Sequence, residues 1–122
     1  TPTPTPTPTA TATATPTPTP TAAPTATPAC FTPVAKFVVN PTGGFRDKPN
    51  RPGTVFEFTD QSLNMDAACA PIWSWSFGDG SGASSNQNPS YVYSQHGSMT
   101  VTLASSNSMG SSTATFTITV AN

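Results

Sequence analysis

The chain has 122 residues with four basic and five acidic side chains and a formal net charge of −1, which allows one small domain. So few basic side chains exclude a nucleic-acid-binding protein, because phosphate contacts need clustered Lys and Arg. No apolar stretch of about 18 residues occurs, which excludes a membrane-spanning helix.

The first part of the chain contains only three residue types. Residues 1–28 are all Thr, Pro or Ala, with Thr at every odd position from 1 to 21 and Pro or Ala at every even one. Such a segment cannot bury enough apolar surface to offset the entropy cost of ordering, and its prolines favour an extended polyproline II conformation. Alternate prolines also remove donors from a sheet ladder, which disfavours a β-strand. We therefore expect a stalk or linker over residues 1–29 and a folded domain over residues 30–122.

Thr beside Pro is the composition of O-glycosylated stalks, in which sugars would stiffen the chain and shield it from proteases. A plain flexible spacer is the alternative. The candidate O-glycosylation sites are Thr1, Thr3, Thr5, Thr7, Thr9, Thr11, Thr13, Thr15, Thr17, Thr19, Thr21, Thr25 and Thr27.

Cys30 and Cys69 are the two cysteines of the chain. In a sequence poor in charge and rich in Thr and Ser we interpret them as one disulfide, which indicates an extracellular or cell-surface location. Two free buried thiols are the alternative. Two Cys and a single His lack the spacing of a metal site, so we expect neither a metal nor another cofactor.

Strand signals follow Cys30 in a regular series, and no window shows a helical stripe. The predicted strands cover residues 35–40, 55–60, 72–77, 91–93, 99–103 and 115–120. Short strands with period two and turns about every ten residues predict an all-β fold with two antiparallel sheets packed as a sandwich. Alternation predicts an inward-facing set of Phe37, Val39, Phe56, Phe58, Trp73, Trp75, Phe77, Tyr93, Val101, Leu103, Phe116, Ile118 and Val120.

The run Trp73-Ser74-Trp75-Ser76-Phe77-Gly78-Asp79-Gly80 resembles the central signature of polycystic kidney disease (PKD) domains, which are immunoglobulin-like sandwiches. The resemblance extends over about residues 34–121, with Ser76 where the family often has Asp and Met99 where it often has Tyr. It implies a non-catalytic spacer, adhesion or assembly module of surface and secreted proteins. The core signature residues are then Trp73, Trp75, Phe77, Gly78, Asp79 and Gly80.

Candidate chemistry is sparse. No serine lies in a nucleophile elbow, and His96 precedes Gly97 in a predicted turn, so we expect no catalytic residue. Weak calcium candidates are Asp60, Asp66 and Asp79, although a tight Asp-Gly turn explains the last of them more simply.

Aromatic side chains are the other candidates for binding. Trp73 and Trp75 would form a sugar-stacking platform if they were exposed, but alternation places both in the core. We expect Tyr91 to point away from Tyr93 and to be the exposed aromatic contact.

The sequence therefore predicts a non-catalytic structural or adhesive module of an extracellular or cell-surface protein. In this interpretation it is a repeating subunit of a filament, whose tail contacts a neighbouring subunit, so its partners are copies of itself or neighbouring surface domains. The alternative is a carbohydrate- or protein-binding accessory module that the Thr/Pro spacer links to a hydrolase domain, with polysaccharide as a candidate partner.

Overall fold

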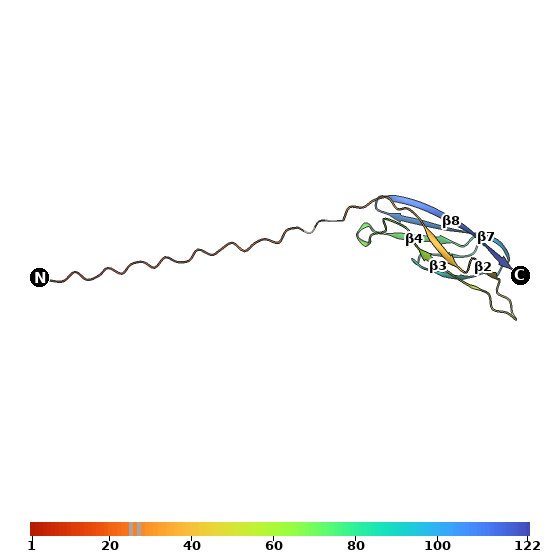
Figure 1. Cartoon of the computed structure of the whole chain (residues 1–122), viewed down its shortest axis with the longest axis horizontal. Coiled ribbons are helices and arrows are strands. Elements are labelled where there is room, and N and C mark those ends of the chain that lie inside the picture. Colours follow the sequence, from red (N-terminus) through yellow and green to blue (C-terminus); the bar gives the residue numbers. More distant parts are fainter. Residues whose placement is uncertain (25, 27) are drawn as a thin grey trace.

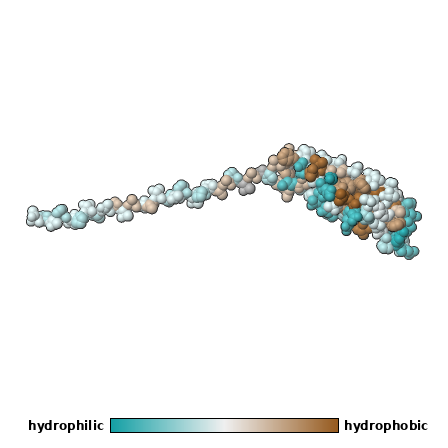
Figure 2. Space-filling view, viewed as in Figure 1, coloured by the Kyte–Doolittle hydropathy of each residue, from teal (hydrophilic) through white to brown (hydrophobic). Residues whose placement is uncertain are grey.

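The computed structural model describes residues 1–24, 26 and 28–122, so the candidate glycosylation sites Thr25 and Thr27 lie outside the described residues. Figure 1 shows an extended N-terminal segment followed by a β-sandwich. The described residues before Ala29 are exposed and belong to no helix or strand. In Figure 2 this segment is pale, since Thr, Pro and Ala have intermediate hydropathy, whereas strongly apolar side chains gather on the sandwich.

The sandwich has the predicted immunoglobulin-like, all-β architecture with two sheets. The three-stranded sheet has the order β1-β3-β6, from Phe37–Asn40, Val55–Asp60 and Ser90–Val92. The five-stranded sheet has the order β2-β8-β7-β4-β5, from Gly43–Phe45, Gly110–Ala121, Gly97–Asn107, Ile72–Ser76 and Ala83–Ser84. Neighbouring strands are antiparallel except β2 and β8, which are parallel. A short 3₁₀ turn, η1, covers Ala67–Cys69, and no described helix is long and apolar enough to cross a membrane.

The hairpin of β7 and β8 is longer than the sequence predicted. The two strands pair from Asn107↔Gly110 to Gly97↔Val120, because Thr and Ser continue the ladder beyond the apolar residues. One face of β7 is buried at Met99, Val101, Leu103 and Ser105, and the intervening side chains face outward. The buried Ser105 hydroxyl is hydrogen-bonded to Ser62 Oγ at 2.8 Å.

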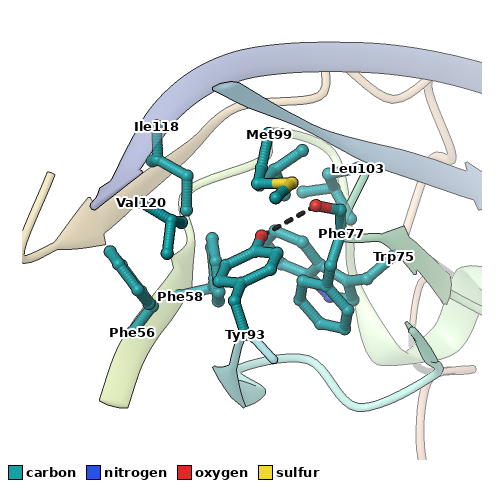
Figure 3. Packing of buried hydrophobic residues seen from close by; sticks show 10 residues of the cluster. Phe56, Phe58, Trp75, Phe77, Tyr93, Met99, Leu103, Ile118 and Val120 are labelled. Atoms are coloured by element: carbon teal, nitrogen blue, oxygen red, sulfur yellow. Dashed lines mark hydrogen bonds between the residues drawn. The ribbon is translucent and has the colours of Figure 1, made fainter. Parts of the chain in front are cut away.

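Aromatic rings fill the space between the sheets (Figure 3). Phe58 lies 5.2 Å from Phe77 and 5.5 Å from Trp75, measured between ring centroids. The Tyr93 hydroxyl donates to the backbone oxygen of Phe77 at 2.7 Å, and burial raises the pKa of this hydroxyl. The buried core consists of Phe56, Phe58, Trp75, Phe77, Tyr93, Met99, Val101, Leu103, Ile118 and Val120.

Some side chains that alternation placed inward are less buried than expected. Phe116 is 42% exposed, although it lies on the inner face of β8 beside Val101. Three strands face five, so part of the wider sheet has no cover. Phe37, Val39 and Trp73 are half-buried and pack against the edge of the core.

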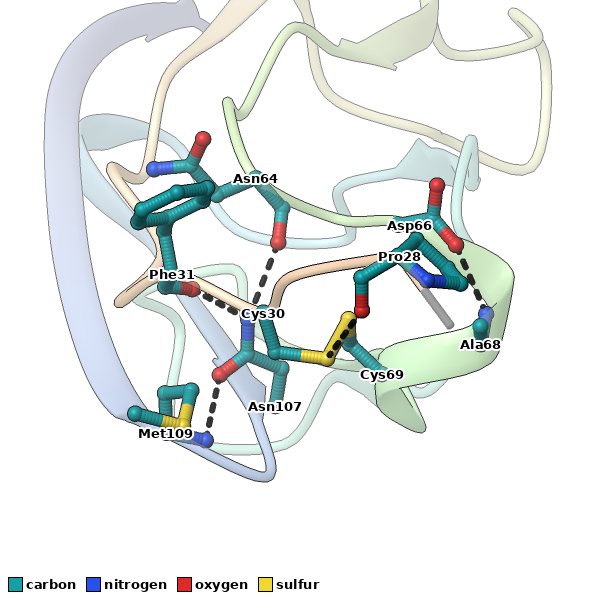
Figure 4. Close-up of a disulfide and its surroundings, with 9 residues drawn as sticks. All are labelled: Pro28, Cys30, Phe31, Asn64, Asp66, Ala68, Cys69, Asn107 and Met109. Atoms are coloured by element: carbon teal, nitrogen blue, oxygen red, sulfur yellow. Dashed lines mark hydrogen bonds between the residues drawn. A yellow bond between two sulfur atoms is a disulfide. The ribbon is translucent and has the colours of Figure 1, made fainter. Parts of the chain in front are cut away.

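A disulfide joins Cys30 to Cys69 (Figure 4). Cys69 ends η1, just before β4, and is buried. Beside the bridge, the Asn107 Nδ2 group donates to the backbone oxygen of Phe31 at 2.7 Å and to that of Asn64 at 2.9 Å. The bridge and these hydrogen bonds fix the start of the folded region to the loop before β4 and to the β7–β8 turn.

Removing the disulfide should destabilise the domain. The bridge closes a loop with a sequence separation of 39 residues, for which chain entropy alone contributes about 4 kcal/mol. We expect the double variant Cys30→Ala/Cys69→Ala to lose about this much free energy of unfolding in a urea titration. Reductant should lower the stability of the parent chain similarly and leave the variant unchanged, whereas equal stability of all samples would contradict the role of the bridge.

Candidate functional site

The signature turn after β4 is built around two glycines and a carboxylate. Gly78 has φ +83°, and a Cβ at this position would lie 2.4 Å from the backbone oxygen of Thr100, so no other residue fits. Asp79 follows, and its Oδ1 accepts hydrogen bonds from the backbone N–H groups of Ser81 and Gly82, each at 3.0 Å. The carboxylate therefore holds the turn in place by binding its own backbone.

Tyr91 covers this turn. Its hydroxyl donates to Asp79 Oδ2 at 2.7 Å, and its ring stacks on Phe77 with the centroids 4.1 Å apart and the planes within 8°. A Cβ on Gly82 would lie 2.3 Å from the Tyr91 ring, so the turn and the ring fit closely. Tyr91 is half-buried, and the prediction that it forms an exposed contact is wrong. Residues two apart in a strand share one face, so Tyr91 and Tyr93 both point inward.

The pKa values of Asp79 and Tyr91 are those expected for a fixed structural hydrogen bond between a carboxylate and a hydroxyl. Burial by itself would raise the pKa of Asp79, but hydrogen bonds from the Tyr91 hydroxyl and from the amides of Ser81 and Gly82 outweigh it and hold this pKa below its ordinary value. Burial and the neighbouring carboxylate raise the pKa of Tyr91. At neutral pH the pair is therefore an ionised acceptor and a protonated donor, and no proton moves between them.

A second hydrogen-bonded group lies at the end of β3. Asp60 Oδ2 accepts from Trp73 Nε1 at 2.7 Å and from Gln87 Nε2 at 3.1 Å. The Trp75 Nε1 group donates to the backbone oxygen of Asn86 at 2.8 Å. Trp75 is buried and Trp73 is half-buried against the core, so the two indoles do not form an open sugar-stacking platform. The sequence did not reveal the pairing of Asp60 with Trp73, because it joins residues on different sheets.

The three calcium candidates belong to three separate hydrogen-bonded groups. Asp79 fixes the signature turn, Asp60 binds Trp73, and Asp66 accepts from the backbone N–H of Ala68 at 2.8 Å as the cap of η1. Within the part of the chain that the structure describes, no group of three His, Cys, Asp or Glu side chains could hold a metal ion. Their shared use as a calcium site therefore has no geometric support.

A cavity of about 330 Å³ lies beside the disulfide. Its only ionisable group is the Asp66 carboxylate, which already caps η1. Its lining residues are Ala29, Phe31, Asn64, Met65, Asp66 and Cys69. The cavity thus combines one carboxylate with apolar and amide groups and brings together no nucleophile and base.

Known proteins resemble the folded region. A family model for the PKD domain matches residues 38–121. The PKD1 domain of Vibrio anguillarum Epp is similar, with 26% identity and a TM-score of 0.57 over 76% of this chain and 98% of that chain. The PKD1 domain from the Vibrio cholerae metalloprotease PrtV has 26% identity and a TM-score of 0.56 over 75% and 100%.

A third similar structure is described as the "structural basis for the promiscuous specificity of the carbohydrate-binding modules from the beta-sandwich super family". The identity is 30% and the TM-score is 0.61 over 78% of this chain. The match covers only 36% of that chain, so this chain spans little more than a third of it. Among curated proteins no sequence matches this chain.

The bond between Asp79 and Tyr91 should make stability depend on pH. Because the pKa of Asp79 is depressed in the folded state, its contribution is fully present above its unfolded pKa of about 3.9 and is lost as pH falls through the lower folded pKa. We expect urea titrations between about pH 7 and pH 2 to show a smaller loss of stability for Asp79→Asn than for the parent chain. Glu57→Gln, at an exposed position of β3, is the control for loss of one carboxylate, and identical pH profiles of the parent and Asp79→Asn would disprove the role of this bond.

Proposed function

Since this chain belongs to the PKD domain family, we propose that it is a non-catalytic structural or adhesive module of an extracellular or cell-surface protein. Residues 1–29 act as a stalk, and residues 30–122 form the PKD domain. In the more specific form of the proposal the chain is a repeating subunit of a filament, and its stalk contacts a neighbouring subunit.

One observation carries the proposal: the chain enters and leaves the sandwich at opposite ends. The backbone oxygen of Phe31 accepts from Asn107, and a Cβ on Gly110 would lie 3.5 Å from Thr32 Cγ2, so the chain enters beside the start of β8. It ends at Asn122, just past the other end of this 12-residue strand, which is about 40 Å away. Figure 1 shows the two ends of the sandwich in this arrangement. Such a domain suits an in-line spacer, because its neighbours are held apart by its full length.

The polar groups support a structural role as well. Asp60, Asp66 and Asp79 each bind groups of their own fold, and the outward positions of β7 and β8 are mostly Thr and Ser. These neutral side chains hydrogen-bond water without charge, so copies of the domain approach one another without strong electrostatic repulsion. The exposed threonines of the stalk remain accessible for O-glycosylation, which we include in the proposal.

Negative-stain microscopy of native material tests the filament proposal. We expect continuous filaments, because a head-to-tail contact that does not close on itself propagates. Discrete particles at every concentration would contradict it. The intact mass of the same material reports the glycans, and a mass equal to that of the bare peptide would contradict glycosylation of the stalk.

A carbohydrate-binding accessory module is a second candidate, favoured by the similarity to a structure described as concerning carbohydrate-binding modules. The exposed aromatic side chain to test is Phe45, which is 49% exposed and lies 4.3 Å from the Arg51 guanidinium carbon. This alternative predicts retention of the chain on insoluble cellulose or chitin and loss of retention in Phe45→Ala. Under the structural proposal neither protein is retained.

A further inference from the structure

The strand β8 has one edge that is largely unpaired. On one side β7 pairs with β8 along its whole length. On the other side β2 reaches only Thr119, Val120 and Ala121. Among the described residues, no backbone hydrogen bond joins residues 110–118 to another segment on that side. A long edge of this kind offers a template for a further strand.

The register shows which groups are free at this edge. The backbone N–H of Arg46 donates to the backbone oxygen of Ala121 at 3.0 Å, so this odd-numbered residue of β8 directs its backbone groups to the outer edge. Because these groups alternate along a strand, the other odd-numbered residues of β8 also point outward and the even-numbered ones bond to β7. The free N–H and C=O groups therefore belong to Ser111, Thr113, Thr115 and Thr117.

This edge lacks the features that normally prevent pairing. Residues 110–118 contain no charged residue and no proline, whereas exposed edges are usually protected by Lys, Pro or a bulge. Beside the edge, on the inner face, Phe116 is 42% exposed. An added strand would thus satisfy backbone groups and cover an apolar ring at the same time.

The tail has the complementary pattern. Every proline before residue 30 stands at an even position, and Thr stands at every odd position from 1 to 21. Neighbouring residues of an extended strand direct their N–H groups to opposite edges. The missing donors of proline therefore all fall on one edge of the tail, and the other edge keeps every N–H and C=O group. Proline therefore prevents pairing at one edge of the tail only, since it is compatible with an outermost strand whose N–H side faces solvent.

We propose that the edge of β8 from Ser111 to Thr117 binds the Thr/Pro tail of a second copy of this chain as an added antiparallel strand. This inference rests on the proposed structural function and identifies the contact surface. In the antiparallel arrangement, tail threonines lie opposite Thr113, Thr115 and Thr117 on the outer face, where Thr pairs are favourable. Tail prolines then lie on the inner face, over Phe116. A parallel strand would place threonine hydroxyls over this ring instead.

A second copy is a better source of the strand than the same chain. Cys30 is bonded to Cys69, and Ala35 N–H donates to Ser112 Oγ at 3.1 Å, so the chain is already fixed beside the start of β8. Pairing with its own β8 would require a tight reversal just before Cys30, but of the residue types that favour tight turns residues 21–30 contain only proline and no Gly, Asn, Asp or Ser. The alternating segment of 21 residues is ample in length, because the edge needs only seven. The outer edge of the added strand lacks donors at its prolines, so the sheet grows no further there.

Two variants, each with four added prolines, test whether the odd-numbered residues of the tail supply the backbone groups that bind β8. The odd variant is Thr5→Pro/Thr9→Pro/Thr13→Pro/Thr17→Pro. The edge of β8 pairs with four successive odd-numbered tail residues, and any such set between residues 1 and 21 then includes at least one proline without an N–H donor. The even variant is Ala10→Pro/Ala12→Pro/Ala14→Pro/Ala22→Pro, which adds prolines only at even positions and leaves the donors at odd positions in place. All eight positions lie in the exposed tail, so the sandwich is unaffected. Sedimentation equilibrium should show self-association of the parent and the even variant, and at least tenfold weaker association of the odd variant.

Amide hydrogen exchange of the parent chain, read by NMR at low and high protein concentration, provides the second measurement. We expect the amides of Thr113, Thr115 and Thr117 to exchange more slowly at high concentration, and slowing must be absent in the odd variant. If all three proteins associate equally without this protection, the edge contact is wrong while the self-association of the proposed function stands. If none of the three proteins associates, both the edge contact and the proposed self-association are wrong.

Discussion

Phe58 of the three-stranded sheet packs against Trp75 of β4 and against Phe77, which directly follows β4, at centroid distances of 5.5 and 5.2 Å. This contact between rings holds the two sheets together, and the rest of the domain is arranged around it. Large rings can be buried here because their polar atoms find partners in the backbone, as the Tyr93 hydroxyl does at Phe77 and the Trp75 indole at Asn86. The signature turn then follows from the same packing, since Tyr91 stacks on Phe77 and reaches Asp79.

Local alternation predicted the parts of this structure that depend on neighbouring residues. The strands at residues 55–60, 72–76 and 97–107 have a clear period of two, and their inward faces were identified correctly at Phe58, Trp75 and Leu103. The short strands β2 and β5 carry no such pattern and were missed. Tyr91 lies two residues before Tyr93, so a period of two places both rings on the inward face, contrary to the outward direction predicted for Tyr91.

Other features depend on residues far apart in the sequence and could not be predicted locally. Alternation gives the side of the sheet on which Phe116 lies, but its exposure depends on how far the opposite sheet extends. The bonds from Trp73 to Asp60 and from Asn107 to Phe31 join different strands and loops. The free edge of β8 likewise follows from the shortness of β2, which begins only at Gly43, opposite Thr119.

The disulfide has a mechanical consequence. Tension between the tail and the C-terminus would enter at Cys30, cross the bridge to Cys69 and continue into β4. The segment between the two cysteines, which includes β1, β2 and β3, lies outside this covalent path. If the sandwich were pulled apart, that segment would stay looped, and only the chain beyond Cys69 would lengthen. An oxidised domain is therefore a link of limited extensibility, and a reducing environment would let the same domain stretch over its whole length.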